Sequence, residues 1–200
     1  MLVFMLLAYL LGSIPFAVVS SWIFKLPDPR TYGSKNPGAT NVLRSGKKAA
    51  AFLTLLGDAG KGWLVVIMAQ YFAPFWGLGS EVTAIMALAV FLGHVFPIFL
   101  RFQGGKGVAT AVGVLLGLNP WIGLLAIMTW ILVALVWRIS SLSALIAALL
   151  APVYAGLIMG FEANTLAILV MALLLIWRHQ SNIANLISGK EGRIGKQNNS

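Results

Sequence analysis

Three short polar stretches hold the residues of this 200-residue chain that are best suited to chemistry. The first is residues 32–44, YGSKNPGATNVLR, in which Asn-Pro-Gly signals a turn. A short helix after the turn would place Asn41 and Arg44 on one face. Basic residues at such places can simply meet anionic lipid headgroups, and that interpretation suits the lysine pair that follows the stretch. For Ser34 and Arg44, which stand among residues that shape the backbone, we expect a functional role.

The second stretch is residues 101–110, RFQGGKGVAT, where three glycines surround Lys106 and open into a helix. Glycines let backbone N–H groups approach an anion, and the helix N-terminus and the lysine both add positive charge. No glycine stands five residues before Gly105, and no Ser or Thr follows Lys106, so this is not a Walker A loop. The pattern predicts a phosphate site that does not bind ATP. The alternative is close helix packing with a lysine that lies on the cytoplasmic side under the positive-inside rule.

The third stretch is residues 178–185, RHQSNIAN, which continues the last apolar run. His179 and Asn182 are three residues apart and would share a helix face. We consider His179 a candidate general base or a group that orients a hydroxyl. Glu191 is the acid that follows this basic region, and an ion-pair role in the structure fits it better than catalysis.

Charged residues also occur inside an apolar run, where they are costly and usually face a pocket or each other. Asp58 and Lys61 are spaced i, i+3, which predicts a mutual ion pair that shapes a pocket wall. His94, near the end of the next apolar run, is expected to be a hydrogen-bonded buried histidine.

Several enzyme classes are excluded by what the chain lacks. There is no cysteine, which removes thiolate chemistry and disulfides. Only two aspartates are present, too few for the carboxylate clusters of enzymes that bind paired metals, so we predict no metal. No Asp stands five residues after either histidine, which excludes His-x-x-x-x-Asp acyltransferases, and no Gly-x-Ser-x-Gly occurs.

Composition predicts a polytopic helical membrane protein. Apolar residues make up 60% of the chain and charged residues 10%, with a mean hydropathy of +0.91, whereas soluble domains carry about 25% charged residues. The run 107–137 would be about 46 Å long as one helix, so we divide it at Asn119-Pro120. Gly12-Ser13-Ile14-Pro15 predicts a kink in the first run. The seven expected segments, the fourth unusually short, are 2–24, 50–75, 82–100, 108–118, 120–137, 141–160 and 164–177.

The distribution of charge predicts the orientation. With the N-terminus outside, 13 of the 14 Lys and Arg residues fall on the cytoplasmic side and the outer loops hold two glutamates, as the positive-inside rule favours. A five-crossing variant, with 108–118 and 120–137 as a re-entrant hairpin, has the same parity and stays open. We therefore expect an all-α membrane domain over residues 1–195, a disordered end at 196–200, a cytoplasmic C-terminus, and convergence of the three polar stretches on the cytoplasmic face.

Over nearly its whole length the chain resembles the bacterial membrane-integral acyl-phosphate:glycerol-3-phosphate acyltransferases. The similarity rests on motifs in the same order: residues 12–15, residues 33–44, Asp58 with Lys61-Gly62, residues 93–110, and Arg178-His179 with Asn182. The chain departs from the pattern of the family in two places. Gln103 stands where members of the family often carry lysine, and the residues after Arg193 resemble nothing in the family.

The resemblance implies a function and a set of site residues. The family transfers an acyl group from acyl phosphate to glycerol 3-phosphate, makes lysophosphatidic acid at the start of phospholipid synthesis, works in the bacterial inner membrane and needs no cofactor. The implied partners are the two substrates and the bilayer, not nucleic acid. The implied catalytic residues are Ser34, Arg44, His179 and Asn182. The implied phosphate-binding residues are Lys35, Asn41, Lys61, Arg101, Gly104, Gly105, Lys106 and Gly107, with Asp58 and Glu191 in structural roles.

Two alternatives stay open at this point. The base that takes the proton of the attacking hydroxyl is either His179 or a phosphate oxygen of a substrate. The rival function is a transporter or exchanger of a phosphorylated metabolite, which basic residues and a glycine-rich half-helix would also suit. The gathering of the polar motifs on one face and the lack of a two-fold repeat favour the enzyme over the transporter. A non-catalytic lipid-binding scaffold would not need His179 or Asn182.

Overall fold

The computed structural model describes residues 1–194, and within that range the chain is helical and contains no strand. The all-α class predicted from the sequence is thus confirmed for these residues, whereas the expected disordered end at 196–200 lies outside them. The elements are α1 Leu2–Gly12, α2 Phe16–Ile23, α3 Ala39–Leu43, α4 Lys48–Phe72, η1 Ala73–Trp76, α5 Ser80–Val95, η2 Ile98–Leu100, α6 Val108–Leu118, α7 Pro120–Trp137, α8 Ser140–Met159, α9 Ala163–Arg178 and α10 Gln180–Ile187.

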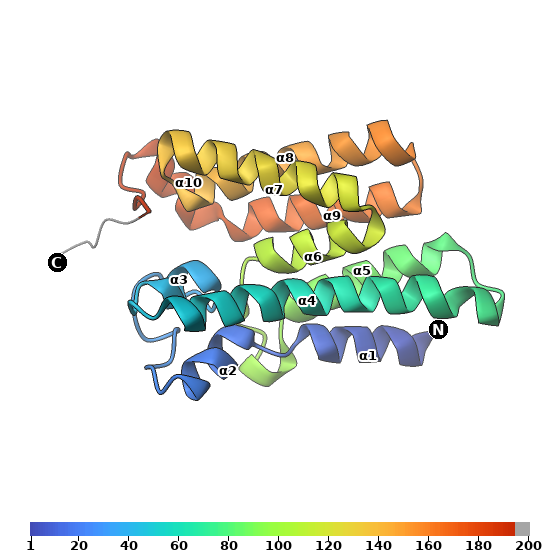
Figure 1. Cartoon of the computed structure of the whole chain (residues 1–200), viewed down its shortest axis with the longest axis horizontal. Helices are drawn as coiled ribbons and strands as arrows, with labels where there is room; N and C mark the ends of the chain where they lie inside the picture. Colours follow the sequence, from blue (N-terminus) through green and yellow to red (C-terminus); the bar gives the residue numbers. More distant parts are fainter. Residues whose placement is uncertain (195–200) are drawn as a thin grey trace.

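The long helices run side by side along one axis, with α3 and α10 at the same end (Figure 1). Helices α1, α2, α4 and α5 pack in one group, and α7, α8 and α9 pack in a second. The short α6 lies between the groups and packs on both α4 and α7. A Cβ atom on Gly113 of α6 would come within 1.8 Å of the carbonyl oxygen of Ala59, so glycine is what lets α4 and α6 approach this closely.

Both predicted helix breaks are confirmed. The Asn119 side chain caps α7 by accepting a hydrogen bond of 2.9 Å from the backbone N–H of Trp121, and Pro120 takes the first helical position. At the other break, α1 and α2 meet at an angle of 43° across residues 13–15. At this break the carbonyl oxygen of Ile14 accepts a hydrogen bond of 2.9 Å from Nζ of Lys61 on α4.

Among residues 1–194, four helices are long and apolar enough to cross a membrane: Lys48–Trp76, Ser80–Leu100, Pro120–Trp137 and Ser140–Met159. Counting the bent pair α1–α2 and the bent pair α9–α10 as one span each raises the number to six. Helix α6, with 11 residues, is shorter than the roughly 20 residues a full crossing needs. The count of seven segments therefore stays a prediction, with α6 as the segment on which it depends.

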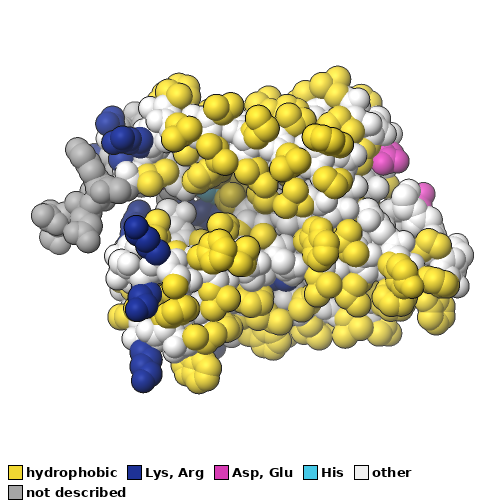
Figure 2. Space-filling view, viewed as in Figure 1, with side chains coloured by type: hydrophobic (Ala, Val, Ile, Leu, Met, Phe, Trp, Pro, Cys, Tyr) yellow, Lys and Arg dark blue, Asp and Glu magenta, His cyan; other side chains and the backbone are white. Residues whose placement is uncertain are grey.

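The surface separates charge along the bundle axis. Figure 2 shows hydrophobic side chains along the sides of the helices, Lys and Arg at the end that holds α3 and α10, and acidic side chains at the opposite end. The exposed Glu81 and Glu162 belong to the loops at that opposite end. This is the asymmetry on which the predicted orientation rests, and it gathers the three polar stretches at the basic end.

Candidate active site

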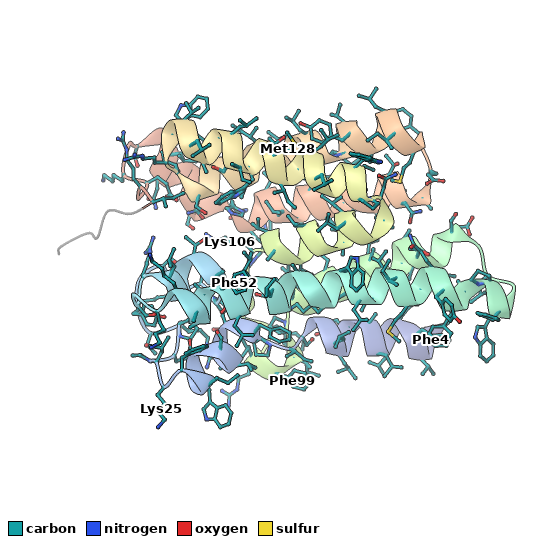
Figure 3. The ribbon with its side chains drawn as sticks, in the orientation of Figure 1. Phe4, Lys25, Phe52, Phe99, Lys106 and Met128 are labelled. Carbon is teal, nitrogen blue, oxygen red and sulfur yellow. The ribbon has the colours of Figure 1, made fainter. Side chains whose placement is uncertain are left out.

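The glycine-rich loop between η2 and α6 has a backbone that ordinary residues rarely adopt. Arg101, Phe102 and Gly107 have φ angles of 51°, 63° and 90°. A Cβ atom on Gly107 would lie 2.3 Å from the ring of Phe91, so both the φ angle and the space require glycine there. Arg101 is exposed, whereas Gly104, Gly105 and Gly107 are buried and Lys106 is half-buried. Figure 3 shows Lys106 near the start of α6.

The second and third polar stretches meet through Lys106. Its Nζ donates to the Oδ1 atom of Asn182 on α10. The Nδ2 atom of Asn182 in turn donates to Oε1 of Glu191 at 2.6 Å, and Oγ of Ser141 donates to the same oxygen at 2.6 Å. Glu191 therefore fixes the amide of Asn182 so that its oxygen faces the lysine. Ser141, at the start of α8, is a member of this network that the sequence analysis missed, since nothing in its local sequence signals a partner 50 residues away.

Arg178, the last residue of α9, holds the backbone of the loop. Its Nη2 donates to the carbonyl oxygen of Gly104 at 2.9 Å, and its Nε donates to that of Gly105 at 3.3 Å. With these two carbonyl groups turned toward the guanidinium, the loop keeps a defined shape. Arg178 belongs to the third polar stretch, but its local sequence gives no sign of this role.

His179 is buried, with 3% of its surface exposed, at the junction of α9 and α10. Its Nδ1 lies 2.8 Å from the carbonyl oxygen of Leu175. A carbonyl oxygen can only accept, so Nδ1 carries the hydrogen and Nε2 is left as an acceptor. Burial lowers the pKa of His179 to about 4, so the imidazole is neutral at pH 7.

The charge of the site is positive and partly withdrawn from water. Burial lowers the pKa of Lys106 below the usual lysine value; Glu191 opposes this shift, while the positive charges of Arg178 and Arg44 add to it. The positive charges of Lys106, Arg178 and Arg44 thus repel one another within the site. An anionic ligand with more than one negative charge would relieve their mutual repulsion.

In the first polar stretch, Asn41 is turned inward and organises the loop before it. It is 2% exposed, its Oδ1 accepts from the backbone N–H of Ser34 at 2.9 Å, and its Nδ2 donates to the carbonyl oxygens of Pro29 and Tyr32 at 2.6 and 3.2 Å. Ser34 and Lys35 are exposed, and Lys35 has a φ angle of 56°. Asn41 thus shapes the backbone that presents both side chains.

Arg44 connects this stretch to the others. A Cβ atom on Gly33 would lie 3.2 Å from Nη1 of Arg44, and a Cβ atom on Gly192 would lie 3.8 Å from its Nη2. The guanidinium therefore lies between the first loop and the segment that carries Glu191. The convergence of the three polar stretches, expected from the sequence, is present in the structure.

The predicted Asp58–Lys61 ion pair is confirmed, with 2.8 Å between Oδ1 and Nζ. Lys61 is 3% exposed, and its Nζ also donates to the carbonyl oxygen of Ile14 at 2.9 Å and lies 3.0 Å from Nδ1 of His94. A small pocket is lined by these ionisable residues and by Gly104 and Gly105. The direct phosphate contact expected of Lys61 stays a prediction.

A family model described as glycerol-3-phosphate acyltransferase matches residues 2–189. The protein named glycerol-3-phosphate acyltransferase from Nitrosospira multiformis is 67% identical over 193 residues, covering 96% of each chain. The protein of that name from Nitrosomonas eutropha is 69% identical over 189 residues, covering 94% of each.

Solved structures give the same similarity in three dimensions. PlsY, an integral membrane glycerol 3-phosphate acyltransferase, matches in its glycerol 3-phosphate form with a TM-score of 0.88 and 36% identity, over 97% of this chain and 95% of that one. Its lysophosphatidic acid form matches with a TM-score of 0.87 and 35% identity. The membrane-embedded helical fold expected from composition is confirmed by this match.

Proposed function

Because this chain belongs to the glycerol-3-phosphate acyltransferase family, we propose that it transfers a long-chain acyl group from acyl phosphate to the 1-hydroxyl of glycerol 3-phosphate. The products are 1-acyl-glycerol-3-phosphate, which is lysophosphatidic acid, and inorganic phosphate, at the first step of phospholipid synthesis. The observation that carries the proposal is the glycine-rich loop of residues 104–107, whose Lys106 contacts Asn182 beside His179. PlsY has been solved in forms with the corresponding substrate and product.

The chemistry needs charge neutralisation before anything else, since two phosphorylated substrates repel each other. We assign the phosphate of glycerol 3-phosphate to Lys106 and to the glycine-rich loop of residues 104–107, in which the N–H of Gly105 already donates to the carbonyl oxygen of His94 and so shapes the loop. Arg44, with the exposed Lys35 and Arg101, would neutralise the acyl phosphate. Ser34 would contact substrate from the rim. Asn41 and Lys61, for which the resemblance implies phosphate binding, are buried, and we assign them instead the shaping of the two loops from behind. Asp58 and Glu191 keep structural roles.

In the reaction, the 1-hydroxyl oxygen attacks the carbonyl carbon of the acyl phosphate, the bond from that carbon to the phosphate oxygen breaks, and inorganic phosphate leaves. The hydroxyl proton needs an acceptor. With a pKa lowered by burial to about 4, His179 is a much weaker base than an ordinary imidazole, which disfavours it as the proton acceptor. We therefore assign proton transfer to a substrate phosphate oxygen. His179, through its acceptor Nε2, orients the glycerol hydroxyls together with Asn182.

The acyl chain has a place beside the loop. A partly open apolar pocket lies among α6, α7, α8 and α9. It is lined by Val108, which follows the glycine-rich loop directly, and by Leu175, whose carbonyl group binds His179. The remaining lining consists of seven alanines together with Val112, Leu115, Ile168 and Met171. A chain entering here would have its carbonyl end at the basic site and its tail between helices.

Placement in the membrane follows from the charge asymmetry. We propose that residues 1–194 act as one membrane-embedded unit in the bacterial inner membrane, with the N-terminus outside and the basic end in the cytoplasm. The separation of basic and acidic ends in Figure 2 supports this orientation. Water-soluble glycerol 3-phosphate would then enter from the cytoplasm and the acyl chain from the lipid side.

Product analysis tests the proposal. Purified protein in lipid is incubated with glycerol 3-phosphate and either palmitoyl phosphate or palmitoyl-CoA, and the products are identified by mass spectrometry. We expect lysophosphatidic acid with palmitoyl phosphate and none with palmitoyl-CoA. A folded protein that makes no product with either donor would contradict the proposal. Uptake of labelled glycerol 3-phosphate into proteoliposomes would then favour the transporter.

A further inference from the structure

Three buried ionisable residues behind the glycine-rich loop form a connected cluster that the proposed reaction does not use directly. They are Asp58 and Lys61 of α4 and His94 of α5, which are 2%, 3% and 8% exposed. Nδ1 of His94 lies 3.0 Å from Nζ of Lys61 and 3.3 Å from Oδ1 of Asp58. The carboxylate of Asp58 and the ammonium group of Lys61 thus both lie at the Nδ1 edge of the imidazole ring.

The opposite edge of that ring supports the loop. A Cβ atom on Gly105 would lie 2.2 Å from Nε2, 2.8 Å from Cε1 and 3.2 Å from Cδ2, so its three nearest atoms all belong to His94. The backbone N–H of Gly105 also donates to the carbonyl oxygen of His94 at 3.2 Å. On the other side, Arg178 holds the carbonyl groups of Gly104 and Gly105. These two glycines are therefore held between His94 and Arg178.

The cluster is anchored at its far side as well. The Nζ of Lys61 donates to the carbonyl oxygen of Ile14 at 2.9 Å, at the break between α1 and α2. One ammonium group therefore joins the helix break, α4 and α5. Such buried ions are costly, and apolar residues of the same volume would often stabilise a fold as well or better. Packing alone therefore does not explain why charged residues occupy these positions, whereas a role in shaping the glycine-rich loop does.

We propose that Asp58, Lys61 and His94 are positioning residues that hold the ring of His94 against Gly105 and so keep the loop in its phosphate-binding shape. The inference rests on the proposed function, because it takes glycerol 3-phosphate as the ligand of the loop. We therefore expect the cluster to influence the affinity for glycerol 3-phosphate but not the affinity for the acyl donor.

The first test uses the contact between Gly105 and His94. Binding of glycerol 3-phosphate is measured by calorimetry, and KM for each substrate by turnover. We expect His94→Ala to raise the Kd and KM for glycerol 3-phosphate at least tenfold and to leave the KM for palmitoyl phosphate within twofold. Gly105→Ala should lose at least 100-fold in kcat/KM. The double variant should regain at least tenfold over Gly105→Ala, because the ring that a Cβ would strike is gone.

The second test uses the charges. Lys61→Met alone leaves a buried anion without its cation, so the neutral pair Asp58→Asn with Lys61→Met is used. We expect it to raise the KM for glycerol 3-phosphate as much as His94→Ala does, with no further increase when all three changes are combined. Ser20→Ala is the matched control. It breaks a buried 2.5 Å hydrogen bond between α2 and Thr54 of α4 and should lower Tm without moving either KM.

The outcomes separate the two proposals. Wild-type turnover together with unchanged Kd and KM for glycerol 3-phosphate in His94→Ala and in the neutral pair would overturn the positioning role and leave the acyltransferase intact. Loss of kcat in proportion to unfolded protein, with KM unchanged, would show a merely structural cluster. A folded wild-type protein that neither binds glycerol 3-phosphate nor turns over would overturn both.

Discussion

Replacing Lys106 by methionine is the perturbation that bears most directly on the phosphate site. The side chain is half-buried in the glycine-rich loop, and its ammonium group contacts the amide of Asn182. Methionine keeps much of the length and apolar stem of lysine but removes the charge and its hydrogen-bond donors. The loop backbone should therefore survive, while the phosphate that we assign to this loop loses the charge of Lys106.

The expected loss follows from the charges around the site. Two unit charges 4 Å apart interact by about 4 kcal/mol at the effective dielectric constant of a protein surface, near 20. Arg44 and Arg178 remain close to the site and retain part of this attraction. We expect a net loss of about 3 kcal/mol in kcat/KM for glycerol 3-phosphate, which is roughly 150-fold since about 1.36 kcal/mol corresponds to tenfold.

The assay is steady-state release of phosphate from palmitoyl phosphate at varied glycerol 3-phosphate. Lys47→Met is the control, because it removes an exposed charge at the start of α4 at the same end of the bundle and should change kcat/KM less than threefold. Lys106→Arg should retain more activity than Lys106→Met because the charge persists. If folded Lys106→Met has a kcat/KM within threefold of wild type, the assignment of the loop is refuted.

Three further changes probe the base, the loop and the first stretch. His179→Gln should lower kcat by about tenfold and leave the acid limb of the pH profile near 6. The limb should not move because His179, with a pKa of about 4, is already neutral at that pH. A loss of kcat above about 1,000-fold would instead mark His179 as the base. Gly107→Ala, with a φ of 90° and a Cβ site 2.3 Å from Phe91, should lose at least tenfold in kcat/KM, whereas Gly160→Ala, with a φ of 79° and open space, should keep it. Asn41→Ala removes three hydrogen bonds and should lower the free energy of unfolding by about 2–3 kcal/mol, measured by denaturation of the purified protein.

Local signals were enough to predict much of this fold. Asn119-Pro120 marks a helix break because proline disfavours helix before it and suits the first turn after it. The i, i+3 spacing of Asp58 and Lys61 within an apolar run predicts an ion pair, since isolated charges there are too costly. Asymmetry of Lys and Arg brings the polar stretches to one end without any knowledge of packing. In the first two cases the determining residues are neighbours in sequence. In the third, one rule for the whole chain is enough, namely that Lys and Arg lie on the cytoplasmic side.

Contacts between distant segments could not be predicted in this way. The hydrogen bond from Ser141 to Glu191 depends on how the chain after α10 folds back to the start of α8. The spacing of Asn41 and Arg44 puts them on one side of a short helix but does not reveal that Asn41 is buried and Arg44 exposed. Likewise, the contact of His94 with Gly105 requires the loop to return onto α5, which no periodicity encodes.

The central claim is direct transfer between two phosphorylated substrates at the basic end of the bundle. Release of inorganic phosphate from palmitoyl phosphate, followed in a rapid-mixing experiment with and without glycerol 3-phosphate, tests it most directly. We expect no release without glycerol 3-phosphate, and with it one phosphate for each lysophosphatidic acid formed. A burst of one phosphate per protein molecule in the absence of glycerol 3-phosphate would indicate a covalent acyl-enzyme and would refute direct transfer.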